Sequence, residues 1–164
     1  MVRRRVIAII GSGSELEPAV SNARELGRRI AENGWVLISG GRDAGVMKAA
    51  NEGAKQAKDS LTIGILPNRE AKISDAVDVA IVTDTGQARN NIIVLTADVV
   101  IACGVDGAGT ASEVSLAIKN GNHVVLLDVS DEAKQFFARI GDGRVHIAGS
   151  AQQAIEITER LITS

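Results

Sequence analysis

The chain has 164 residues, which is enough to bury one hydrophobic core of ordinary domain size. Its formal net charge of −2 supplies no general attraction for nucleic acid or for an anionic membrane surface, so neither is expected as a partner. The one cysteine, Cys103, excludes an intramolecular disulfide and a cysteine cluster for zinc, and with two histidines in all we expect no metal site.

The first apolar run covers residues 6–10 and reads as a buried strand that ends directly at Gly11. The basic residues before it resemble the start of a signal peptide, but the run is too short for one. No stretch of the sequence reaches the length of a membrane span. We therefore expect a cytoplasmic protein.

Apolar runs of this kind alternate with amphipathic segments along the whole chain. The first helix is expected to open near Pro18 and to end at Asn33 and Gly34, because these residue types suit the two ends of a helix. A polar residue, Asp78, lies inside the fourth apolar run and indicates a strand nearer the edge of the sheet. Strands are predicted over residues 6–10, 35–39, 61–66, 77–82, 99–103, 124–127 and 145–147, and the later helices over residues 44–57, 87–96, 110–119, 131–140 and 151–161.

This alternation predicts the fold class. Strands separated by helices imply right-handed crossovers and a parallel sheet. The composition agrees, because 45% of the residues are hydrophobic but only 2% are aromatic, so that aliphatic side chains must form the core. We predict one α/β domain over residues 1–164, a doubly wound parallel sheet with helices on both faces and thus three layers.

Glycine clusters follow three of the predicted strands, where open parallel sheets bind their ligands. They are Gly11 and Gly13 around Ser12, Gly40 and Gly41 with Gly45, and Gly104 with Gly107 and Gly109. Glycine lets the backbone approach a ligand closely, and the free N–H groups at the next helix start attract phosphate. The alternative is that these turns serve only the fold. Three clusters in equivalent places favour a small anionic ligand.

Two common phosphate-binding motifs fit poorly. Residues 11–16 supply two of the three glycines of the dinucleotide fingerprint, and the second strand ends without an acidic residue for a ribose. No Gly-Lys-Ser or Gly-Lys-Thr sequence of a P-loop occurs. The sequence therefore does not favour NAD or a P-loop nucleotide.

Three sequence blocks carry a family resemblance: SGGRDAGVM at residues 39–47, RNN at residues 89–91 and GVDGAGTASE at residues 104–113. They resemble the signature blocks of the Rossmann-like superfamily of lonely-guy cytokinin-activating enzymes, lysine decarboxylase-like proteins and molybdenum cofactor carrier proteins. The resemblance runs from residue 6 to about residue 127 and is strongest to the carrier branch. It implies homo-oligomers, either dimers or tetramers, and molybdoenzymes that receive the cofactor.

The resemblance implies a carrier or storage protein for molybdenum cofactor, a pterin with a terminal phosphate. Such carriage needs no nucleophile, and we assign no catalytic residue. The predicted cofactor-binding residues are Gly11, Ser12, Gly13, Gly40, Gly41, Arg42, Arg89, Gly107, Gly109, Thr110 and Glu113.

The alternative is a phosphoribohydrolase that acts on nucleoside 5′-monophosphates, with Arg89 and Glu113 in active roles. Against it, Gly104-Val105-Asp106-Gly107 replaces the Pro-Gly-Gly of the lonely-guy enzymes, and Asn90 replaces their lysine. A nucleotide-sensing module that binds without turnover is a third reading.

Several of these residues also have purely structural interpretations. Thr110 and Glu113 have the spacing of a capping box, in which both would satisfy backbone donors at a helix start. Arg89 could be a solvated helix residue, and Cys103 is expected to be a small core residue. Asp128 is expected to face the ligand crevice. The roles of Asp43 and Asp106 stay open.

Overall fold

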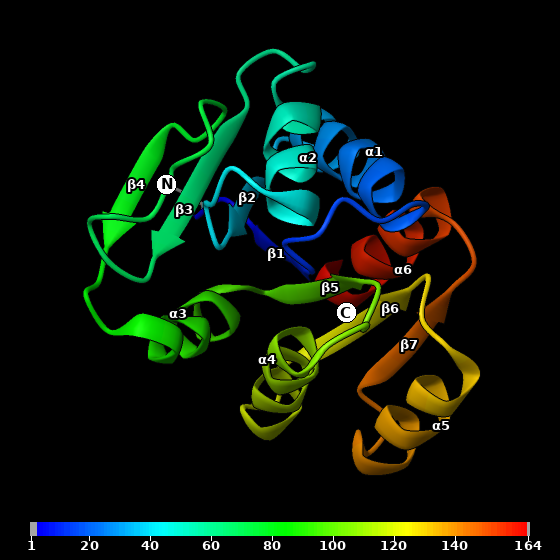
Figure 1. Ribbon diagram of the computed structural model, residues 1–164. Helices are drawn as coiled ribbons and strands as arrows, with labels where there is room; N and C mark the ends of the chain where they lie inside the picture. The colour runs from blue at the N-terminus through cyan, green and yellow to red at the C-terminus, as the bar shows by residue number, and fades with distance from the viewer. Residues whose placement is uncertain (1–2, 164) are drawn as a thin grey trace.

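The computed structural model describes residues 3–163. Its strands form one parallel sheet of order β4-β3-β2-β1-β5-β6-β7 (Figure 1). The strands are β1 (Val6–Gly11), β2 (Val36–Ser39), β3 (Leu61–Leu66), β4 (Val79–Val82), β5 (Val99–Cys103), β6 (His123–Leu127) and β7 (Val145–Ala148).

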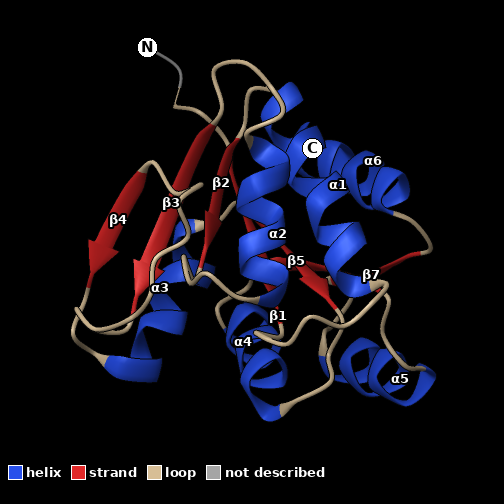
Figure 2. Cartoon of the chain, turned by 45° about the horizontal axis from the view of Figure 1, so that its top comes forward, coloured by secondary structure: helices blue, strands red, loops and turns tan. Residues whose placement is uncertain are grey.

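Helices cover both faces of this sheet, which confirms the predicted doubly wound, three-layer α/β fold (Figure 1). One face carries α1 (Ala19–Glu32), α2 (Gly45–Ala54) and α6 (Ala151–Thr163). The other carries α3 (Arg89–Thr96), α4 (Ala108–Lys119) and α5 (Asp131–Ile140). Figure 2 shows α1 and α2 side by side on their face. No helix within residues 3–163 is both long enough and apolar enough to cross a membrane.

The central strands β1 and β5 carry no polar side chain, because both of their faces are covered. In β1, Ile7 and Ile9 pack against α1, α2 and α6, whereas Ala8 and Ile10 pack against the helices of the other face. At the edge, all of β4 (Val79–Val82) is exposed, so the expectation of an edge position for the fourth strand is confirmed.

Most of the sequence-predicted element bounds differ from the structure by one to three residues. The helix predicted over residues 44–57 covers only Gly45–Ala54, and a short 3-10 helix, η1 (Gly86–Ala88), precedes α3. Most important for the site, α4 begins at Ala108, with Gly107 at the N-cap and no side-chain cap. Thr110 therefore lies inside the first turn, and the capping-box interpretation of Thr110 and Glu113 is wrong.

The chain order of the strands creates a switch point between β1 and β5. From β1 the chain builds the sheet outward to β4, and then it returns to place β5 on the other side of β1. The loops after these two neighbouring strands therefore diverge to opposite faces, and a crevice opens between them.

Candidate functional site

A cavity of about 390 Å³ lies at this switch point, within the range of roughly 300–1,000 Å³ that small-ligand pockets occupy. It is lined by the loops after β1, β2 and β5 and by the beginnings of α3 and α4. All the predicted residues except Gly41 line it: Gly11, Ser12, Gly13, Gly40, Arg42, Arg89, Gly107, Gly109, Thr110 and Glu113.

Gly41 has a structural task instead. Its φ of +67° lies in the left-handed region, and a Cβ there would come within 2.7 Å of the Gly64 Cα atom. Its backbone N–H donates to Ser39 Oγ at 3.1 Å. Gly41 therefore lets the chain turn tightly against β3, and the structure does not bring it to the cavity.

Two glycines of the first loop region bring the start of α2 against the end of β1. A Cβ on Gly11 would lie 2.6 Å from the side chain of Val46, and one on Gly45 would collide with the backbone of the loop after β1. In this close approach the Val46 N–H donates to the Ser12 carbonyl oxygen at 3.0 Å. These contacts give one wall of the cavity its shape.

Gly107 and Gly109 differ from those glycines because packing does not require them. A Cβ on either would meet no atom within 4 Å, and Gly107 has an extended backbone that any residue can adopt. Both line the cavity at the start of α4. The first N–H groups of a helix have no partner within the helix, and here no side chain caps them. The helix start therefore combines free donors with open space, as an anion site requires.

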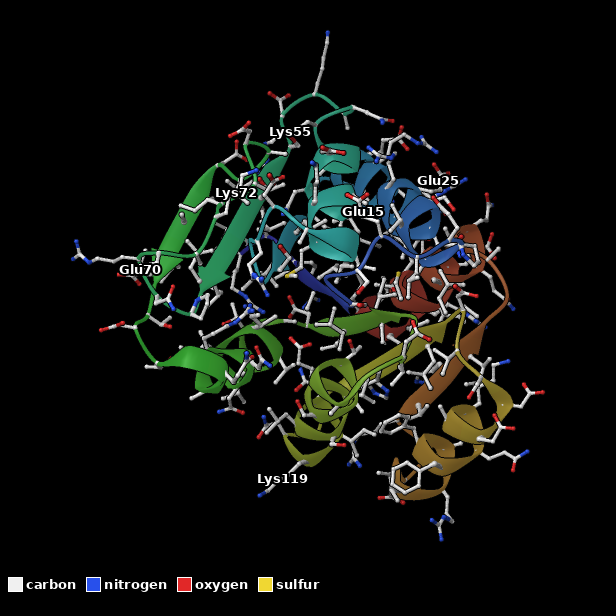
Figure 3. All side chains as sticks on the ribbon, viewed as in Figure 1. Glu15, Glu25, Lys55, Glu70, Lys72 and Lys119 are labelled. Atoms are coloured by element: carbon white, nitrogen blue, oxygen red, sulfur yellow. The ribbon has the colours of Figure 1, made fainter. Side chains whose placement is uncertain are left out.

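Four polar residues of the cavity are buried, Thr110 at 5% exposed and the three residues below, whereas charged side chains such as Glu70 and Lys119 point outward from the body of the molecule (Figure 3). Arg89 is 6% exposed, Asn90 5% and Glu113 9%. We call these three residues the polar floor. They come from the first turn of α3 and the second turn of α4.

The polar floor has much unused hydrogen-bonding capacity. Arg89 Nη1 donates to the Ile65 carbonyl oxygen at 2.9 Å, but Arg89 Nε and Asn90 Oδ1 have no hydrogen-bond partner among residues 3–163. The Glu113 carboxylate accepts no hydrogen bond from residues 3–163. Because unpaired buried polar groups cost stability, a site that keeps two of them beside the unpaired Glu113 carboxylate suits a polar ligand.

The charges on the floor influence each other across the cavity. Burial raises the pKa of Glu113 to about 7, and the positive charge of Arg89 opposes this rise. Burial lowers the pKa of Arg89, Glu113 counteracts this, and the exposed Arg42 lowers it further. The carboxylate thus lies within electrostatic reach of Arg89.

Gly40 makes room for this arrangement. A Cβ on Gly40 would collide with Arg89 Nη1 and would lie within 2.5 Å of Met47 Sδ. Because Arg89 is buried in this way, its interpretation as a solvated helix residue is wrong.

Other polar candidates lie elsewhere. Asp128 lines a separate cavity beside α5, so its predicted place in the ligand crevice is wrong. Asp43 forms ion pairs with Lys48 at 3.2 Å and with Lys72 at 2.6 Å. Cys103 is fully buried in the core, where burial raises the pKa of its thiol to about 12.

Besides Asp106, sequence reasoning did not select six residues that line the cavity: Ile9, Ile10, Ser14, Met47, Gln87 and Asn90. For Asn90 the sequence does contain a signal, because this residue lies inside the RNN block, where it replaces the lysine of the lonely-guy enzymes. Asp106 also lines the cavity, at the exposed turn before α4.

Known proteins resemble this chain both in sequence and in structure. The sequence model of the SLOG cluster4 family matches residues 4–155. An uncharacterized protein from Archaeoglobus fulgidus is 44% identical over 121 residues, which cover 74% of this chain and 78% of that protein. The structure is similar to the molybdenum cofactor binding protein of the phototrophic bacterium Rippkaea orientalis, with a TM-score of 0.93 and 48% identity over 99% of both chains. It is also similar to the molybdenum cofactor carrier protein of Chlamydomonas reinhardtii, with a TM-score of 0.93 and 43% identity over 99% of this chain and 100% of that chain.

Proposed function

Because the chain belongs to the SLOG cluster4 family, we propose that it is a carrier protein for molybdenum cofactor. The resemblance noted from the three sequence blocks is confirmed by this membership and by the two similar structures, whose names state that they bind or carry this cofactor. Both structures match nearly the whole chain, so the likeness includes every element around the cavity.

The observation that carries the proposal is the fit between the cavity and a phosphate-bearing ligand. Gly107 and Gly109 leave a space that side chains could occupy without disturbing the protein, and the uncapped start of α4 adjoins it. We propose that backbone N–H groups of this turn and of the Ser12–Gly13 loop bind the phosphate, and that Arg89 and Arg42 add positive charge.

Carriage rather than chemistry is the favoured reading. Holding and releasing a cofactor needs shape and hydrogen bonds, and we assign no nucleophile or catalytic base. The competing phosphoribohydrolase reading would use Arg89 and Glu113 in the same cavity, but it predicts the Pro-Gly-Gly turn and the lysine that this sequence lacks.

A protection assay tests the proposal. Isolated molybdenum cofactor is incubated with the purified chain or with buffer, and samples taken over time are used to reconstitute a cofactor-free nitrate reductase. We expect the chain to prolong reconstitution, and Arg89→Gln to weaken the effect. Arg139→Gln, an exposed change on α5, is the matched control and should protect like the wild type.

Two outcomes decide between the readings. If the wild-type chain protects the cofactor no better than buffer does, the carrier proposal fails. Release of free base from AMP, lost in Glu113→Gln, would then support the enzyme.

The proposal also covers the location, the oligomeric state and the protein partners of the chain. We propose that the chain acts in the cytoplasm as a homo-oligomer and passes its cofactor to molybdoenzymes. The apolar edge strand β4 supports an oligomer, because all four of its residues are exposed.

A further inference from the structure

The polar floor of Arg89, Asn90 and Glu113 offers a specific pattern of donors and acceptors. The guanidinium of Arg89 can only donate, the carboxylate of Glu113 can only accept when ionised, and the amide of Asn90 can do both. All three residues are at least nine-tenths buried and line the cavity. Between them their side chains make one hydrogen bond within the described part of the chain, from Arg89 to the Ile65 carbonyl oxygen.

A ligand that satisfies this floor must carry both kinds of groups on one edge. It needs at least one acceptor for Arg89 or Asn90, and it needs donors for the carboxylate of Glu113. A carboxylate has two oxygens, so two parallel N–H donors complement it best, as in bidentate pairs of arginine with carboxylate. A phosphate presents only acceptors at neutral pH and would leave Glu113 unpaired.

We propose that Glu113 binds the aminopyrimidine edge of the pterin, an inference that rests on the proposed carrier function. The ring N3–H and the 2-amino group would donate to the carboxylate, while the 4-oxo group accepts from Arg89 or Asn90. The phosphate then binds to the glycine loops, where Arg42 and the nearby charge of Arg89 add positive potential. This arrangement pairs the charge of Glu113 with donors and the charge of Arg89 with an acceptor.

The same pattern sets the specificity of the cavity. Guanine presents an equivalent row of one acceptor and two donors, whereas the corresponding edge of adenine offers one donor and one acceptor. A buried group that loses its hydrogen-bond partner is strongly unfavourable, so a ligand without the second donor is rejected. The floor therefore selects pterin and guanine edges over adenine, which also disfavours AMP as the natural ligand.

The raised pKa of Glu113 agrees with this assignment. Without a ligand, burial keeps the carboxyl partly protonated near neutral pH. Two donors aimed at the carboxylate would favour its ionised form and remove the cost of burying it.

A matched pair of compounds tests the inference. Pterin carries an amino group at position 2, and lumazine carries an oxo group at the same position. Binding of each to the purified chain is measured by calorimetric titration. We expect pterin to bind about 10- to 100-fold more tightly, the effect of one or more hydrogen bonds to a charged group. In Glu113→Gln this preference should vanish, whereas Glu132→Gln, an exposed change on α5, should keep it.

The outcomes separate this inference from the carrier function. Equal binding of the two compounds by the wild-type chain, or an unchanged preference in Glu113→Gln, overturns the inference. If the wild type still protects the complete cofactor, the carrier proposal survives that result. If neither compound binds measurably, the release of the complete cofactor is compared instead. Glu113→Gln should then release it faster than the wild type, and equal release refutes the binding of the pterin edge by Glu113. A preference for pterin without any protection of the cofactor would refute the carrier proposal alone.

Discussion

Glu113 is the residue at which ligand binding and protein stability conflict most directly. It is 9% exposed, has no hydrogen-bond partner within residues 3–163, and has a pKa raised to about 7. Taking an ionised carboxyl group out of water without a partner is costly, and part of that cost is avoided by holding a proton. The protein is therefore less stable with this polar lining than it would be with an apolar one.

This conflict predicts a pH-dependent stability. The ordinary pKa of Glu113 is 4.5 and its folded value about 7, so the folded state keeps a proton that the unfolded state has released. The free energy of unfolding of the wild type should fall as the pH rises from 4.5 to 7, by up to about 3 kcal/mol relative to Glu113→Gln. Urea unfolding of both chains at about pH 5 and about pH 8 measures the difference. Parallel pH profiles for the two chains would show that the carboxyl is not buried as described.

The sequence alone does not show which polar side chains are buried in the cavity. Arg89 and Asn90 are adjacent residues of a helix start, a place where side chains are usually solvated. Only the tertiary structure buries them, because the backbone of β3 and the bare Cα of Gly40 lie against the guanidinium. No local pattern contains that information, although the RNN block pointed to the right segment.

At the scale of helices and strands, most of the fold could be predicted. The strands over 61–66 and 99–103 and the helix over 131–140 have the predicted bounds. Clear signals explain this success: the helix has Ser130 as its N-cap, which accepts from the Ala133 N–H at 3.3 Å, and acidic residues in its first turn. The start of α4 was mispredicted because its first residues include glycine, which disfavours a helix in isolation.

Helices α1 and α2 pack so closely that two glycines become indispensable. A Cβ on Gly27 of α1 would collide with the Ala50 carbonyl of α2, and one on Gly53 of α2 would collide with the Arg24 carbonyl of α1. Both obstacles are backbone atoms, which cannot move aside as a flexible side chain can. We expect Gly53→Ala to lower the free energy of unfolding by about 1–3 kcal/mol, despite the better helix propensity of alanine. Urea unfolding tests this, and a chain of unchanged stability would contradict the close packing.

The opposite result is expected in α4. Gly109 is helical and open to the cavity, so alanine there should raise the free energy of unfolding by up to about 1 kcal/mol. The new methyl group would project into the cavity where we place the ligand, so protection of molybdenum cofactor should weaken. Ser115→Ala, on the exposed side of the same helix, is the control and should leave protection unchanged. A Gly109→Ala chain that protects the cofactor normally would remove this turn from the proposed site.

For the whole molecule, the order of the strands determines where the site lies. The return of the chain beside β1 opens a crevice at the ends of β1 and β5, and it brings together loops that are about 90 residues apart in sequence. The alternation of strands and helices was enough to predict this location. It could not distinguish glycines that serve packing, such as Gly11 and Gly41, from those that leave room for a ligand, such as Gly107.

The two edges of the sheet differ in a way that concerns assembly. On β4, Val79, Ile81 and Val82 are each 43–45% exposed, and Leu95 of the following helix α3 is 57% exposed. On β7, at the other edge, Ile147 is the large apolar residue exposed to a similar degree, at 41%. An unpaired apolar edge strand invites pairing with another chain, and proteins usually cover it. Two copies of β4 in antiparallel orientation would complement each other around a two-fold axis.

We therefore expect the chain to form its homo-oligomer through β4. Ile81→Lys places a charge in the middle of that strand and should shift the protein towards monomers in analytical ultracentrifugation. Because Ile81 is partly exposed, the unfolding free energy of the monomer should change by no more than about 0.5 kcal/mol. Ile147→Lys makes the same change on the opposite edge and should leave the oligomer intact. If the wild type is monomeric, or if only Ile147→Lys dissociates it, the β4 edge is not the interface, and its apolar residues need another explanation.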